Sequence, residues 1–193
     1  ERTLEERGKE VLNSLPEDKE AVVILGRPYN TGDPALNMNL VEKLINLNVI
    51  PIPIDFLPVT AEHITRDYYQ MYWPNGQSIL AGARIVGRDK KLHAVYMGNY
   101  RCGPDSFLSH FVLEEMAGKP YLELEIDEHS ADAGLITRCE AFIDSLRGSQ
   151  LTNKKKYEVF TPVGFSNSPE KDRVLWFPYM CDAGEAVARR RAG

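Results

Sequence analysis

The sequence predicts a three-layer α/β fold with a doubly wound, mostly parallel sheet. Short apolar runs alternate with segments of helical periodicity, which is the order expected when crossover helices join parallel strands. The runs at 21–25 and 92–97 are nearly continuous in apolar residues, as in strands buried on both faces. A loop rich in turn-forming residues follows each of them, where open α/β sheets place their binding sites.

Length and composition are those of a globular protein. The chain has 193 residues, 43% hydrophobic and 26% charged, and a formal net charge of −5. This charge gives no footprint for nucleic-acid binding, and no apolar run reaches membrane-spanning length, so we expect neither partner. Three widely spaced cysteines favour a reducing compartment, and we expect a cytoplasmic location. The ends of the chain suggest that it is a fragment of a longer protein. We expect the fragment to be inactive by itself.

An ordered loop follows the first strand. A polar helix is expected at 3–13, before the strand at 21–25. The loop 26–34 has the glycine, proline and asparagine density of an ordered turn system. Its Arg27 and Tyr29 are suited to hold an anion, although the loop matches neither the P-loop nor the dinucleotide-binding pattern.

The second strand is expected at an edge of the sheet. A helix predicted for about 36–47 carries leucines on one face and leads to the strand at 49–54. Pro51 and Pro53 cannot donate hydrogen bonds to a neighbouring strand, which places this strand at or near an edge.

The segment 55–91 is longer than a simple crossover. Its aromatic cluster, 68–73, is interpreted as a packed cap over one end of the sheet, and the alternative is an apolar lid over a ligand or cofactor. A helix follows, whose apolar residues on one face are Ile79, Leu80, Ala83, Val86 and Gly87.

Cys102 occupies the most informative position in the chain. It follows the strand at 92–97 in a tight turn, and Asp105 or Ser106 is expected to cap the next helix. A helix amino terminus and the neighbouring Arg101 both favour a thiolate. The alternative for such a cysteine is a purely structural role.

The fourth strand, 121–126, ends in an acidic loop. Asp127, Glu128 and His129 of this loop have the atoms of a hard-metal or acid/base site. The alternative is a helix-entry loop with Ser130 or Asp132 as the cap.

The predicted domain layout has four parts. Residues 1–19 contain the N-terminal helix, and residues 20–148 form the α/β domain. A linker or irregular segment is expected at 149–170, and 171–193 are expected to be the first β-turn-α unit of an incomplete second domain.

Connection rules favour the strand order 2-1-3-4, as in Rossmann-like and flavodoxin-like sheets. In this order the chain reverses direction between the first and third strands, and a crevice opens between the loops 26–33 and 99–105. The candidate binding residues expected to meet there are Arg27, Tyr29, Asn30, Asn99, Arg101 and Cys102.

Several strings carry a resemblance to a known family. They are GRPYN at 26–30, NYRCGPDSF at 99–107, DEHSADAG at 127–134 and PYM at 178–180. They resemble the uncharacterised domain of large proteins related to the activators of 2-hydroxyacyl-CoA dehydratases. That domain is similar in turn to the dehydratase and benzoyl-CoA reductase subunits, and the resemblance covers most of residues 20–191.

The resemblance implies iron–sulfur chemistry. In those relatives an ATP-hydrolysing activator injects one electron into an iron–sulfur cluster that also meets the acyl-CoA thioester. Carried to this chain, it implies Cys102, and less strongly Cys181, as ligands of a cluster in the full-length protein, absent from this fragment. Cys139 stands where the resembling domain has an aliphatic residue, and its helical stripe also predicts a core position. Because a cuboidal cluster takes three or four protein ligands, the others lie outside this chain or no cluster forms.

Two classes of function remain open. The first is an iron–sulfur electron-relay or reductase-type component, in which Arg27 and Arg101 attract CoA phosphates and the partners are an activase ATPase domain or subunit and acyl-CoA. The second is a non-catalytic docking module for an activase or a CoA-thioester enzyme, without metal. Covalent thiol catalysis ranks third, because the sequence places no suitably oriented histidine near Cys102.

Overall fold

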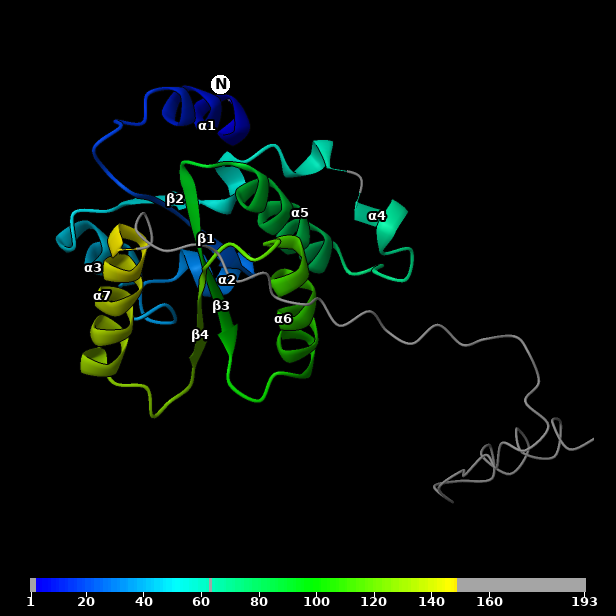
Figure 1. Cartoon of the computed structure of the whole chain (residues 1–193). Helices are drawn as coiled ribbons and strands as arrows, with labels where there is room; N and C mark the ends of the chain where they lie inside the picture. The colour runs from blue at the N-terminus through cyan, green and yellow to red at the C-terminus, as the bar shows by residue number, and fades with distance from the viewer. Residues whose placement is uncertain (1–2, 63, 149–193) are drawn as a thin grey trace, which may run out of the picture. The chain divides into compact units, whose positions relative to one another are not determined.

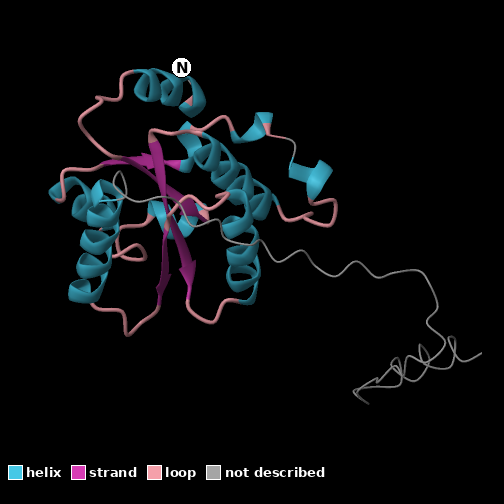
Figure 2. Ribbon diagram, viewed as in Figure 1, coloured by secondary structure: helices cyan, strands magenta, loops and turns pink. Residues whose placement is uncertain are grey.

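The computed structural model describes residues 3–62 and 64–148 and confirms the α/β prediction (Figures 1 and 2). Its sheet is four-stranded and parallel, in the order β2-β1-β3-β4, as predicted. β1 and β3 therefore lie side by side in the centre. The strands are β1 (Ala21–Gly26), β2 (Ile50–Pro53), β3 (Leu92–Asn99) and β4 (Leu122–Ile126).

Helices cover both faces of the sheet and complete the three layers (Figure 2). α5 and α6 pack on one face, and α3 and α7 on the other. None of the helices in the described ranges is long and apolar enough to cross a membrane. The cytoplasmic location stays a prediction. The helices are α1 (Leu4–Asn13), α2 (Pro28–Gly32), α3 (Leu40–Asn46), α4 (Ile64–Asp67), α5 (Pro74–Arg88), α6 (Gly103–Glu115) and α7 (Asp132–Gly148), with 3₁₀ turns η1 (Ile54–Phe56) and η2 (Val59–Ala61).

Two hydrophobic cores separate the layers. Because successive side chains of a strand point to opposite faces, Tyr96 joins the core under α5 and α6, whereas Val95 and Met97 join the core under α3 and α7. Cys139 is fully buried in the second core, and burial raises the pKa of its thiol to about 11. Its predicted core position is confirmed.

The largest differences from the predicted element boundaries are at α3 and β3. The helix expected from residue 36 begins at Leu40, because Met38 and Asn39 both adopt a left-handed backbone conformation with φ 53°. β3 continues through Asn99 rather than ending at residue 97, since Gly98 and Asn99 still pair with β4. The edge position of β2 and its prolines is confirmed.

The aromatic cluster at 68–73 divides between two environments. Tyr68 packs on the core beneath α5 and α6 and donates a hydrogen bond to Glu115 Oε1 at 2.8 Å. Tyr69 and Tyr72 are 81% and 91% exposed. Tyr68 and Trp73 thus pack as the predicted cap does, whereas the two exposed tyrosines do not, and the lid over a ligand stays a prediction. The predicted linker and second domain, 149–193, lie outside the described residues.

Candidate functional site

The carboxyl ends of β1 and β3 bring the two predicted loops together. Gly26 pairs with Met97 in the parallel register, and the chain then enters α2 on one side and, after a short turn, α6 on the other. A Cβ on Gly26 would lie only 2.8 Å from the carbonyl oxygen of Met97, so this approach requires glycine. We call the polar region between the two loops the crevice; Arg27, Tyr29, Asn30, Asn99, Cys102 and Asp105 form it.

Arg27 is the centre of the crevice. Arg27 is 8% exposed, and its Nη2 forms an ion pair with Oδ2 of Asp105 at 2.5 Å. The same Nη2 lies 3.5 Å from Sγ of Cys102, and Nη1 donates to the hydroxyl of Tyr29. Burial alone would lower the pKa of Arg27, but the neighbouring charges, led by Asp105, outweigh it and raise the pKa. The guanidinium is therefore a fixed positive group.

Asp105 holds the two loops in register. One of its carboxylate oxygens accepts both from Arg27 and, at 2.7 Å, from the backbone N–H of Asn99, while the hydroxyl of Tyr96 donates to its backbone carbonyl at 3.1 Å. The expectation that Asp105 or Ser106 caps α6 is wrong. Cys102 is the N-cap residue, and no side chain caps the helix. The Asp105 carboxylate instead accepts hydrogen bonds from Arg27 and from the Asn99 N–H.

Asn30 and Asn99 close the other side of the crevice. Nδ2 of Asn30 donates to Oδ1 of Asn99 at 3.0 Å, and Asn30 is 3% exposed. Arg101 does not join them. It is exposed with φ 56°, and its guanidinium lies 5.5 Å from the ring centroid of Tyr100. The cation beside Cys102 is thus Arg27, and the expectation that Arg101 serves this role is corrected.

The rim of the crevice is open. A Cβ placed on Gly32 or Gly103 would meet no atom within 4 Å, and Tyr29 is 52% exposed. Nε of Arg27 is buried and has no hydrogen-bond partner within the described residues. The amino terminus of α6 adds a partial positive charge at the same place. This arrangement favours a negatively charged group at the rim.

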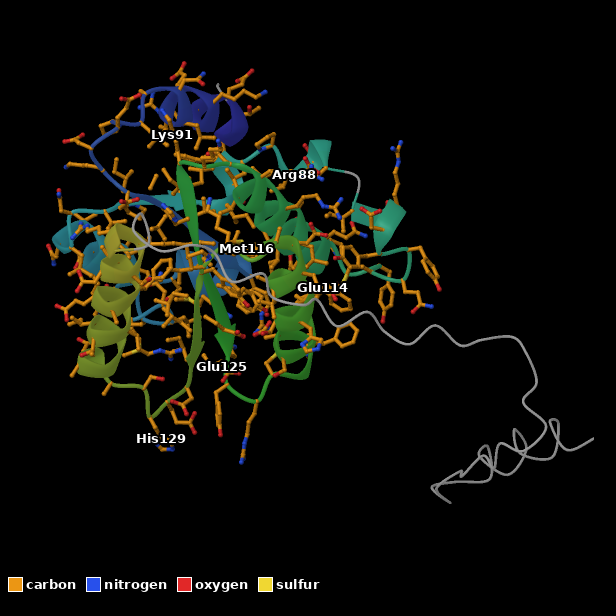
Figure 3. All side chains as sticks on the ribbon, viewed as in Figure 1. Arg88, Lys91, Glu114, Met116, Glu125 and His129 are labelled. Atoms are coloured by element: carbon orange, nitrogen blue, oxygen red, sulfur yellow. The ribbon has the colours of Figure 1, made fainter. Side chains whose placement is uncertain are left out.

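The acidic loop after β4 is a helix-entry turn. Oδ1 of Asp127 accepts from Ser130 Oγ at 2.9 Å and from the His129 N–H at 3.0 Å, and these bonds, led by the one from Ser130, lower the pKa of Asp127. His129 is solvent-exposed (Figure 3). Over the described ranges, no three His, Cys, Asp or Glu side chains converge as a metal site would require.

The described thiols do not form a cluster site. Cys102 borders the crevice with a guanidinium as neighbour, whereas Cys139 is buried between the sheet and α7. Cys181 lies outside the described residues. A cluster needs several converging thiolates, so the described residues alone do not fit one.

Residues 1–57 match the family model described as the CoA enzyme activase uncharacterised domain (DUF2229). Over these residues the match confirms the resemblance to an uncharacterised domain of CoA enzyme activase-related proteins. It includes β1, α2 and β2, hence Arg27, and does not extend to Cys102. No curated protein and no solved structure matches the chain.

Proposed function

We propose that the described domain is a non-catalytic binding module of a CoA enzyme activase-related protein, and that its crevice receives an anionic group of a CoA thioester. The family model supports the setting, since it describes a domain of CoA enzyme activases. The observation that carries the proposal is Arg27, a buried guanidinium held by Asp105 at an open helix amino terminus.

The charges of the crevice favour this role. Asp105 neutralises the single positive charge of the Arg27 guanidinium, so a bound anion interacts chiefly with the amino terminus of α6. Arg101 stands exposed on the same loop and supplies a further cation for a phosphate outside the crevice. The docking partner is then an activase ATPase or an enzyme that carries the same acyl-CoA.

The test is calorimetric titration of the full chain with coenzyme A. Arg101→Gln removes a rim cation without touching the buried ion pair, and we expect a several-fold weaker affinity. Arg66→Gln, an exposed position on α4, is the control and should leave binding unchanged. Absence of coenzyme A binding by the unmodified chain, or equal effects of the two variants, contradicts the proposal.

The electron-relay function is the finer alternative within the same family. It requires Cys102 to join thiolates from outside the described residues, with Cys181 as one candidate. Iron and acid-labile sulfide, measured on the anaerobically purified longer protein and on its Cys102→Ser variant, separate the two functions. Iron that disappears in the variant supports the relay, and a protein without iron supports the binding module.

A further inference from the structure

A second polar site lies at the other end of the strands. It is a pocket of about 490 Å³ between the loop before β1, the loop before β3 and the end of α7. Figure 3 shows Lys91 near the amino end of β3, with Glu125 and His129 at the opposite end of the sheet. The proposed function does not use this pocket.

His93 lines the pocket with one ring nitrogen unpartnered. Nε2 lies 3.0 Å from Oε2 of Glu20, so in the neutral ring Nε2 carries the proton and donates to this carboxylate. Nδ1 then has a lone pair, and it is buried with no hydrogen-bond partner among the described residues. Buried polar atoms in proteins almost always have a hydrogen-bond partner, so we expect Nδ1 to accept a hydrogen bond from a bound group.

The surroundings keep this ring neutral. Burial first, and then the charge of Lys119, lowers the pKa of His93, and Glu20 offsets them only in part. The Lys119 ammonium is fixed at the start of β3 by donating to the carbonyl oxygens of Val86 and Leu92. Nδ1 is therefore a hydrogen-bond acceptor at neutral pH.

The mouth of the pocket is cationic. Lys19, Lys90 and Lys91 line it and are solvent-exposed. Lys91 lies 3.8 Å from Glu17, whereas Lys19 and Lys90 have no ion-pair partner in the described part of the chain. The pocket thus combines two available ammonium groups with one buried acceptor.

We infer that this pocket binds a small oxyanion that also carries an O–H group, the class of hydrogen phosphate and singly protonated phosphate monoesters. The O–H donates to Nδ1 of His93, and the charged oxygens face Lys19 and Lys90. Sulfate has the same shape and a similar charge but no proton at neutral pH. A bound sulfate would place an oxygen acceptor against the acceptor Nδ1, with no proton between them. The pocket therefore binds sulfate less tightly than hydrogen phosphate.

The experiment follows the ring nitrogens of His93 by NMR in the ¹⁵N-labelled full chain. Inorganic phosphate and sulfate are titrated separately at matched ionic strength. We expect phosphate to shift the Nδ1 resonance and to bind roughly fivefold or more tightly than sulfate, the difference that one hydrogen bond makes. The double variant Lys19→Gln/Lys90→Gln should weaken both anions and keep the preference, because both residues are exposed and the ring is unchanged.

Two further variants complete the design. His93→Gln assigns the resonance and should abolish the preference for phosphate. Should that variant fail to fold, the lysine variant still decides. Arg101→Gln, beside the crevice, should leave the response of the His93 ring to phosphate unchanged, which separates this site from the proposed function. A ring that responds equally to the two anions, a response unaffected by the lysine substitutions, or no response to phosphate overturns the inference.

Discussion

The buried ion pair between Arg27 and Asp105 makes a sharp prediction about stability. Asp105→Asn leaves the guanidinium buried without its counterion, at a site where both side chains are at most 10% exposed. Removing one partner of a buried pair costs about 3–5 kcal/mol. Asparagine keeps an oxygen that accepts from the Asn99 N–H, so we expect the lower end, about 3 kcal/mol, out of a total stability of roughly 5–15 kcal/mol.

The assay is urea unfolding of the full chain followed by far-UV circular dichroism, within a double-mutant cycle. Arg27→Met removes the other partner, and the double variant should be less destabilised than the sum of the two single variants by about 2 kcal/mol. Asp144→Asn changes an exposed acid on α7 and should stay within about 0.5 kcal/mol of the unmodified chain. A loss below about 1 kcal/mol for Asp105→Asn, or strict additivity, refutes the reasoning.

Three further predictions concern packing, thiol access and pH. Gly87→Ala should lower the unfolding free energy in urea, because the added Cβ would lie 2.3 Å from a backbone oxygen of α6. The control Gly134→Ala, where a Cβ meets nothing within 4 Å, should be neutral or stabilising by up to about 1 kcal/mol. A Gly87→Ala variant as stable as the unmodified chain would contradict the close contact of α5 and α6. Iodoacetamide should alkylate the partly exposed Cys102 under native conditions and Cys139 only after unfolding, as mass spectrometry of the peptides would show; equal rates would contradict the burial. Folding lowers the pKa of His93 below its ordinary value of 6.5, so the unfolded chain binds a proton at this ring more readily than the folded chain does. The free energy of unfolding, measured by urea titration at several pH values, should therefore fall as the pH drops below about 6.5. His93→Gln should lose this contribution to the pH dependence.

The pocket lined by His93 shows why a candidate site can go unnoticed in the sequence. His93 is the second residue of β3, and its partner Glu20 lies far away in the sequence, so no motif joins them. The signal in the sequence is a single polar residue within a run otherwise typical of a buried strand. Such a residue must find a partner on a neighbouring element, and the parallel pairing of β1 with β3 supplies it.

Local patterns were sufficient for the fold and for the location of the crevice. The apolar runs, the prolines of β2 and the connection rules together predict the order β2-β1-β3-β4, because each reflects a constraint on the backbone or on burial. That order brings the loops after β1 and β3 together, so the meeting of Arg27, Asn30, Asn99 and Cys102 could be predicted.

Tertiary structure alone decided which groups interact within the crevice. Asp105 and Arg27 are 78 positions apart, and the sequence favoured a capping role for the first and Arg101 as the cation beside Cys102. The folded chain pairs the two buried side chains instead, while the left-handed backbone at Arg101 accompanies an exposed guanidinium. Charges buried by the approach of two loops must be paired with each other, and that requirement exists only once the sheet has brought the loops together.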